Sequence, residues 1–225
     1  MKTLILSWIM FGIFWIVEKW NPVDNPTALE RLKNMVCQIP IVVGGALTGT
    51  AVGHLIPCGA VWMWHSWWVS CARLTAYLCL FDLLFYLYHR AQHSVRVLWL
   101  FHRFHHTEVA LNATTAGRSN WMEGPCQGLL AIIPFRLCIS GDLGAGYLLP
   151  VLVTFWVIFN HSNLRLGMGI LTRVIVGPQV HRIHHSILRR HWNKNFAEFF
   201  PVFDILFGTY YHPGWDEFPP TGLAK

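Results

Sequence analysis

The sequence predicts an all-α protein, a multi-spanning membrane helix bundle of about four to five hydrophobic helices. The composition supports this fold class, because 54% of the 225 residues are apolar and only 12% are charged. Ordinary soluble domains carry about 25% charged residues. Long uncharged stretches support the same prediction, since a helix needs about 20 apolar residues to cross a bilayer.

The first two apolar stretches predict three of these helices. Residues 3–17 contain no charge, and the N-terminus lacks the small-residue cleavage site of a signal peptide, so we expect an uncleaved helix. Residues 38–72 contain no Asp, Glu, Lys or Arg, and IPCG at 56–59 interrupts them. This interruption predicts one helix near 38–57 and another that begins near 60 and continues to the YHRAQH segment.

Two further apolar segments, at about 126–139 and 143–160, are separated by SGDLG and predict a helical hairpin. Such a hairpin would leave the membrane on the side where it entered. The last segment, at about 161–225, has mixed composition and is expected to pack as a helical cap on that side. We therefore expect one integral membrane domain over residues 1–225.

Histidines are concentrated in three short segments. FHRFHHT at 101–107 and VHRIHHS at 180–186 share one pattern, and YHRAQH at 88–93 carries a further pair. Spacings of three and four residues place the histidines of each segment on one helix face. The predicted hairpin brings both triplets to the same side of the membrane. Because 14 of the 17 Lys and Arg also lie on that side, we expect it to be cytoplasmic.

Eight histidines on one face favour a metal centre over a solvated surface. Imidazole nitrogens bind iron, zinc, copper and nickel. One ion usually takes about three to five protein nitrogens, so eight histidines are too many for one ion and suit two. The pattern therefore predicts a dinuclear metal site in the cap.

These motifs, together with NHSN at 160–163 and FDILFGTYYHP at 203–213, resemble the fatty acid hydroxylase superfamily, which includes the sterol desaturases. The resemblance covers about residues 75–220, which we take as the catalytic core. It implies a histidine-rich di-iron centre on the cytosolic face of a membrane protein. The metal ligands that it implies are His89, His93, His102, His105, His106, His181, His184 and His185, with His161 of NHSN as an additional one.

The same resemblance implies an oxygenase that hydroxylates or desaturates an unactivated C–H position of a fatty acyl, sterol or related lipid. Its cofactors would be two iron ions and O2, with zinc as an alternative occupant in purified protein. Because the sequence contains no carrier motif, the electrons would come from a separate ferredoxin, b-type cytochrome or reductase. Asp82, Glu123 and Asp204 are candidates for hydrogen bonds to the ligating rings.

Two other classes of function remain open, a transition-metal binding or transport membrane protein and a zinc-dependent membrane hydrolase. A transporter would hold histidines at mid-membrane depth, whereas these follow the ends of predicted helices. A zinc hydrolase needs fewer histidines and usually a carboxylate base beside them. Nucleic acid is not an expected partner, because the formal charge of +6 includes no Lys/Arg-rich run.

Overall fold

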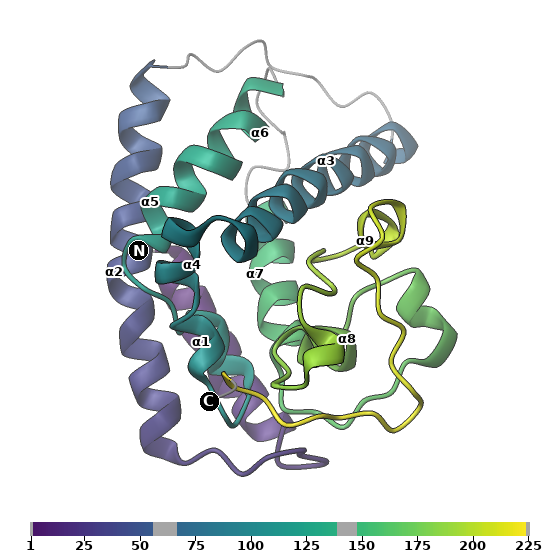
Figure 1. The fold of residues 1–225 in the computed structure, drawn as a ribbon. Coiled ribbons are helices and arrows are strands. Elements are labelled where there is room, and N and C mark those ends of the chain that lie inside the picture. Colours follow the sequence, from purple (N-terminus) through teal and green to yellow (C-terminus); the bar gives the residue numbers. More distant parts are fainter. Residues whose placement is uncertain (1, 56–66, 139–147, 224–225) are drawn as a thin grey trace.

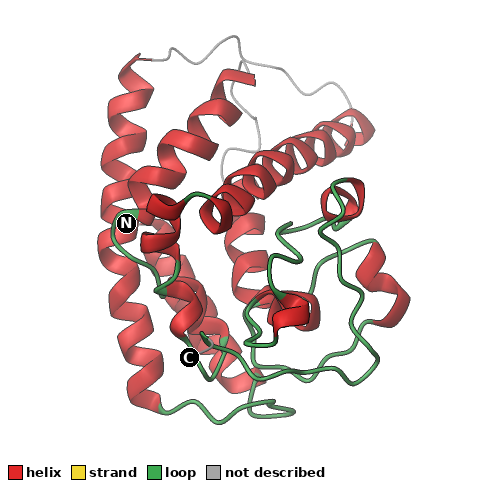
Figure 2. Ribbon diagram, in the orientation of Figure 1, coloured by secondary structure: helices red, strands yellow, loops and turns green. Residues whose placement is uncertain are grey.

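The computed structural model describes residues 2–55, 67–138 and 148–223, and this part of the chain is helical without a β-strand. Four long helices form its body: α1 (Lys2–Val17), α2 (Ala28–Leu55), α3 (Trp67–Ser94) and α7 (Leu148–Asn160). α1 packs against α2 and α7, and α3 runs obliquely across the other end of the molecule (Figure 1). The segment after α7 is mostly loop and lies beside α3 and α7 (Figure 2).

Short helical elements lie between and after the long helices, and they carry the histidines of both triplets except His185. They are α4 (Arg96–His102), η1 (His105–Thr107), η2 (Ala113–Gly117), α5 (Glu123–Gln127), the π-helix η3 (Gly128–Ile132), α6 (Ile133–Cys138), η4 (Gly169–Arg173), α8 (Pro178–His184), η5 (Arg189–His191) and α9 (Val202–Leu206). The expected cap at 161–225 is therefore built from loops and short helices over its described residues.

The prediction of membrane-spanning helices is wrong for the part of the chain that the structure describes. None of its helices combines the length and the apolar character that a bilayer crossing requires. α1 and α7 have 16 and 13 residues, whereas a crossing needs about 20. α2 and α3 have 28 residues each, but α2 begins with ALERLKN and α3 carries Arg73, Asp82 and Arg90.

Two details of that prediction, the break at 56–59 and the hairpin loop at 140–144, lie outside the described residues. The expectation of a cytoplasmic histidine face rests on the predicted crossings and on the distribution of Lys and Arg between the two sides. The structure assigns no membrane side to that face.

The start of α2 is set by a capping box. The Thr27 N–H donates to Glu30 Oε2 at 2.7 Å, and the Glu30 N–H donates to Thr27 Oγ1 at 3.2 Å. This reciprocal pair satisfies N–H groups that a helix start otherwise leaves without partners. α8 begins differently, with Pro178 in its first turn, where a missing N–H costs nothing.

Glycines let α2 approach the segment that follows the first histidine triplet. A Cβ at Gly124 would overlap the carbonyl oxygen of Ile41, and one at Gly128 would press on the Thr48 side chain. Both positions face α2, so its backbone lies closer to α5 than any larger residue would allow. This contact fixes Glu123, the first residue of α5, relative to α2.

A buried acid joins α1 to three other segments. The Glu18 carboxylate pairs with Arg31 of α2. Its Oε1 atom also accepts hydrogen bonds from the N–H groups of Ala113 and Asn163, each at 2.7 Å. Since a buried charge is tolerated only when it is paired and hydrogen-bonded, this arrangement determines how the ends of α1, α2 and α7 meet around the histidines.

Candidate metal centre

The structure brings the histidines into two neighbouring groups of ring nitrogens. Within each group, the nitrogen atoms that could bind an ion lie within 4.8 Å of one another. The first group consists of His89, His93, His102, His106 and His184, and the second of His105, His161, His181 and His185. The groups touch, because the rings of His106 and His185 stack with centroids 4.3 Å apart. All nine residues that the sequence singled out therefore lie in this cluster.

Each H-R-apolar-H-H triplet contributes to both groups in a reciprocal way. The first triplet sends its outer histidines, His102 and His106, to the first group and His105 to the second. The second triplet sends His181 and His185 to the second group and its inner histidine, His184, to the first. In each triplet the two histidines four residues apart share a group and the histidine between them joins the other, so one short motif serves two neighbouring centres.

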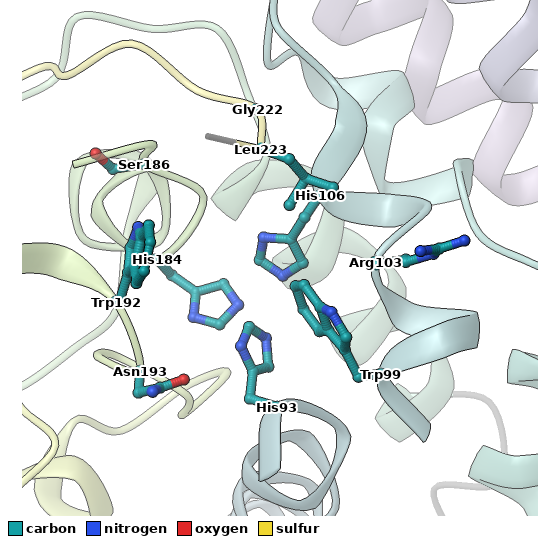
Figure 3. Close-up of a pocket in the computed structure, with 10 residues that line it drawn as sticks. All are labelled: His93, Trp99, Arg103, His106, His184, Ser186, Trp192, Asn193, Gly222 and Leu223. Carbon is teal, nitrogen blue, oxygen red and sulfur yellow. The ribbon is translucent and has the colours of Figure 1, made fainter. Parts of the chain in front are cut away.

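The remaining members come from the ends of long helices. His89 and His93 occupy the last turns of α3, one helical turn apart, and His161 follows the last residue of α7. Figure 3 shows the rings of His93, His106 and His184 pointing toward one another from three separate segments, with Trp99 beside them. Long helices thus bring three ligand candidates to a cluster that the two short motifs complete.

Backbone carbonyls hold four of the rings in one tautomer. The Nδ1 atoms of His89, His105, His161 and His184 lie 2.9, 3.0, 2.7 and 2.9 Å from the carbonyl oxygens of Phe196, Arg118, Val157 and Lys194. A carbonyl oxygen can only accept, so each of these Nδ1 atoms carries the hydrogen. The lone pair is therefore on Nε2, and all four belong to the two groups.

The geometry of the facing nitrogens fits bound cations. His161 Nε2 lies 3.0 Å from His105 Nε2 and 2.9 Å from His181 Nε2. The facing His161 and His105 atoms both carry lone pairs, which repel unless a cation lies between them. Metal–nitrogen bonds of about 2.1 Å at a right angle would separate two ligand nitrogens by about 3 Å. The buried Nε2 atoms of His93 and His184, which have no hydrogen-bond partner, fit the same interpretation.

Burial keeps these rings neutral. It lowers the pKa of all nine histidines, to about 4 for His89 and His105 and well below the usual value for the other seven. A neutral imidazole is the form that binds a metal, because a protonated ring has no free lone pair. The site is therefore ready to accept cations at neutral pH without first losing protons.

Glu123 is the one predicted supporting carboxylate that lies beside a histidine of the cluster. Its Oε1 atom is 3.4 Å from His102 Nδ1, and its Oε2 atom accepts hydrogen bonds from Tyr88 and Gln92. Burial raises the pKa of Glu123 to about 7. Its Oε1 atom forms no hydrogen bond with the ring, so Glu123 lies beside His102 without fixing its tautomer as the carbonyls fix those of four other rings.

Asp82 and Asp204 support the cluster indirectly rather than by bonding to a ring. Asp82 accepts hydrogen bonds from the backbone N–H groups of residues 198–200, and Asp204 accepts from those of Phe196 and Ala197. Together they fix a loop whose Phe196 carbonyl accepts from His89. Neither carboxylate makes the predicted hydrogen bond to a histidine ring. Both accept from backbone N–H groups of a buried loop instead, because such groups need acceptors.

Sequence reasoning missed Glu198 and Asn160, which lie together against the cluster. The Asn160 side chain donates to both the carbonyl and Oε1 of Glu198 at 2.8 Å. Burial raises the pKa of Glu198 to about 8. Asn160 is the first residue of the NHSN motif, and Glu198 lies in the stretch before FDILFG. Nothing in a linear pattern indicates that residues 38 positions apart meet.

Two cavities reach the histidines from different directions. One of about 380 Å³ is lined by His93, His106 and His184 of the first group, together with Trp99 and Trp192 (Figure 3). The other, of about 240 Å³, touches both groups and is lined on its far side by residues of α1, α2, α3 and α7. The second cavity is the one from which a bound molecule would approach both groups at once.

The fold and cluster define a class of protein, a helical protein with a candidate dinuclear centre made of histidines. The model of the fatty acid hydroxylase family matches residues 74–209, which is more than half of the chain. The chain therefore belongs to the fatty acid hydroxylase family, and the resemblance seen in its motifs is confirmed.

Three relatives illustrate the range of this similarity. The chain is 24% identical to an ornithine lipid hydroxylase of Rhizobium tropici over 207 residues, which cover 87% of this chain and 61% of the relative. It is 28% identical to the alkylglycerol monooxygenase of Homo sapiens over 69% of this chain and 32% of the relative. It is 26% identical to a very-long-chain aldehyde decarbonylase of Oryza sativa over 59% and 22%.

The chain thus spans less than two thirds of the length of these relatives. The comparison with solved structures gives no significant match.

Proposed function

We propose that the protein is a metal-dependent lipid oxygenase that hydroxylates or desaturates an unactivated C–H position. The observation that carries the proposal is the pair of touching groups of buried, neutral histidines. Two bound iron ions would supply the dioxygen chemistry, which amino-acid side chains cannot perform themselves. The names of the relatives, two of which are a hydroxylase and a monooxygenase of lipids, support the same reaction class.

The residues of the chain have three tasks in this proposal. The histidines hold the ions, and the carbonyls behind them keep the rings in the metal-binding tautomer. The cavity of about 240 Å³ positions an aliphatic part of the substrate against His89, His102, His105, His161 and His181. Its apolar walls, which include Ile41, Phe85 and Val157, exclude water from the reacting carbon.

Exposed apolar side chains suggest how a lipid reaches this cavity. α1 carries Ile5, Ile9, Ile13 and Ile16 on one helical stripe, and α2 carries Leu32, Val36, Ile39, Val43 and Leu47 on another; all are exposed. Such stripes are uncommon on surfaces that meet only water. We propose that they contact lipid, and both helices also line the cavity through Ser7 of α1 and Ile41 of α2.

The electrons for dioxygen reduction would come from a separate redox protein, a ferredoxin, a b-type cytochrome or a reductase. The described part of the chain is helical and contains no strand-to-helix turn of the kind that binds a dinucleotide. The cavity of about 380 Å³ supports a separate electron donor, because it reaches His93 of the first group and Trp99 beside it.

The decisive experiment measures metal and product together. The purified protein is loaded with ferrous iron and incubated with a total lipid extract, dioxygen and a reducing system. We expect about two irons per chain and a lipid product that has gained one oxygen or lost two hydrogens, detected by mass spectrometry. His105→Ala should abolish the product, whereas His212→Ala, at an exposed histidine outside both groups, should not.

Three outcomes would overturn the proposal. Product formation that survives His105→Ala would separate the reaction from the histidine cluster. Metal bound and released without any oxidised lipid would favour a metal-binding or transport function instead. Hydrolysis of a lipid ester by the zinc-loaded protein would favour the hydrolase.

A further inference from the structure

The cavity that touches both histidine groups has two chemically different walls. Helix α7 contributes mostly apolar side chains, among them Val153, Val157 and Ile158. The side formed by α2 and the segment around α5 has apolar residues too, such as Ile41 and Val42, but it also contributes hydrogen-bonding groups from Gln38, Ser119, Glu123 and Gln127. A plain hydrocarbon would leave this second wall without partners, so the wall suits a substrate that is itself polar on one side.

Gln38 has an unsatisfied polar atom on this wall. Its Oε1 atom is buried and has no hydrogen-bond partner. The side chain is also held in place, because Gly117 packs against it so closely that an added Cβ would lie 3.1 Å from Gln38 Cβ. A buried amide oxygen without a partner is unfavourable, so a hydrogen-bond donor on a bound ligand would be stabilised at this position.

Glu123 offers a second open position on the same wall. Its Oε2 atom is occupied by Tyr88 and Gln92, while the buried Oε1 atom has no hydrogen-bond partner. Oε1 lies 3.4 Å from His102 Nδ1, so this open position is next to the histidines themselves. The polar wall therefore extends from α2 to the edge of the candidate metal centre.

We propose that Gln38 determines substrate specificity by hydrogen-bonding a hydroxyl group of the lipid. The inference rests on the proposed function, since it assumes that the cavity holds the substrate. A hydroxyl both donates and accepts, so it pairs with the Gln38 carboxamide in either orientation of the amide. The substrate class is thus a hydroxyl-bearing lipid rather than an unsubstituted chain.

The size of the cavity limits which carbon of the substrate can be oxidised. A volume of about 240 Å³ is smaller than the roughly 300–1,000 Å³ of ordinary small-molecule sites. The hydroxyl on Gln38 and the carbon beside the histidines must both fit in this space. The carbon that is oxidised therefore lies only a few bonds from the hydroxyl, and the long apolar chain extends away from it.

The test is a binding measurement on the zinc-loaded protein, which cannot turn substrate over. The probes are a hexadecyl ether of glycerol with two free hydroxyls and the same ether with both hydroxyls methylated. We expect the wild-type protein to bind the free diol about tenfold more tightly, as one hydrogen bond to a buried group provides. Gln38→Leu should remove this preference, and Gln38→Glu, which keeps an acceptor, should retain it.

Lys33→Leu is the matched control, because Lys33 is an exposed residue of the same helix outside the cavity. It should bind both probes as the wild type does. If Gln38→Leu does not fold, as judged by its melting temperature, the isosteric Gln38→Met takes its place. Equal affinity of the wild type for both probes, or an unchanged preference in the Gln38 variant, would overturn the inference.

The iron-loaded protein separates this inference from the proposed function. Oxidation of the diol ether within a few bonds of its hydroxyls supports both. Binding preference without any oxidised product refutes the oxygenase and leaves the role of Gln38 intact. Oxidation far along the hexadecyl chain refutes the role of Gln38 and leaves the oxygenase intact.

Discussion

The Nε2 atoms of His105 and His161 face each other at 3.0 Å, although both rings carry their hydrogen on Nδ1. Neither nitrogen can therefore donate to the other. Two lone pairs at this distance repel, and a cation that both can bind turns the repulsion into coordination. The second group of histidines therefore needs a bound cation to remove this repulsion.

Removing His161 should empty that group selectively. His161→Ala leaves three rings in the second group and all five in the first, so we expect the bound metal to fall from about two ions per chain to about one. Elemental analysis of the purified variant measures this directly. The exposed His212→Ala variant should keep both ions, and a His161 variant that also keeps both would show that this ring is not a ligand.

A methyl group at the contact between α2 and α5 should be poorly tolerated. Gly124→Ala places a Cβ against the carbonyl oxygen of Ile41, and we expect a loss of about 1–3 kcal/mol in the free energy of unfolding, as overpacking usually costs. Chemical denaturation measures the change. Gly45→Ala is the matched control, since nothing lies within 4 Å of its Cβ and alanine favours a helix by about 1 kcal/mol. Equal effects at both positions would contradict the tight contact.

The stability of the metal-free protein should depend on pH through Glu198. Burial raises its pKa from 4.5 to about 8, so the folded state holds a proton that the unfolded state releases. This stabilising contribution is present below about pH 4.5 and is lost as the pH rises to 8 and above. Glu198→Gln removes the ionisation while keeping an oxygen for Asn160. Its melting temperature should therefore rise relative to that of the wild type as the pH increases from 6 to 9.

Glu217→Gln provides the control for that experiment. Gly214 N–H and Arg190 lower the pKa of Glu217 against the opposing effect of burial, so its ionised form is the favoured one. Its replacement should not improve stability at pH 9. An identical pH profile for Glu198→Gln and the wild type would show that this carboxyl is already ionised when folded.

The apolar stripes of α1 and α2 should mediate contact with lipid. Replacing Ile9 and Val36 together by Asn removes two exposed apolar side chains without touching the cavity lining. We expect about tenfold weaker co-sedimentation with vesicles of phosphatidylcholine and phosphatidylglycerol. Val174→Asn, at an equally exposed apolar residue elsewhere, should bind vesicles normally, and a double variant that does so too would refute the lipid contact.

Local spacing predicted the candidate site far better than composition predicted the architecture. The pattern of His102, His105 and His106 has meaning within a short stretch of chain, because residues four apart, such as His102 and His106, can lie on one helix face whatever surrounds it. Apolar content does not have such a local meaning. Apolar residues such as Phe11 and Tyr86 are buried inside the protein, whereas others such as Ile9 remain exposed, and a count of apolar residues cannot distinguish these cases.

The sequence by itself determined which nine histidines gather, which residues carry the family motifs and that the chain is helical. Only the tertiary structure decided that each triplet divides between two groups, that the Phe196 and Arg118 carbonyls set the tautomers, and that Glu198 and Gln38 border the centre. The physical reason is distance along the chain. Helical periodicity relates residues a few positions apart, whereas these contacts join residues that only packing brings together.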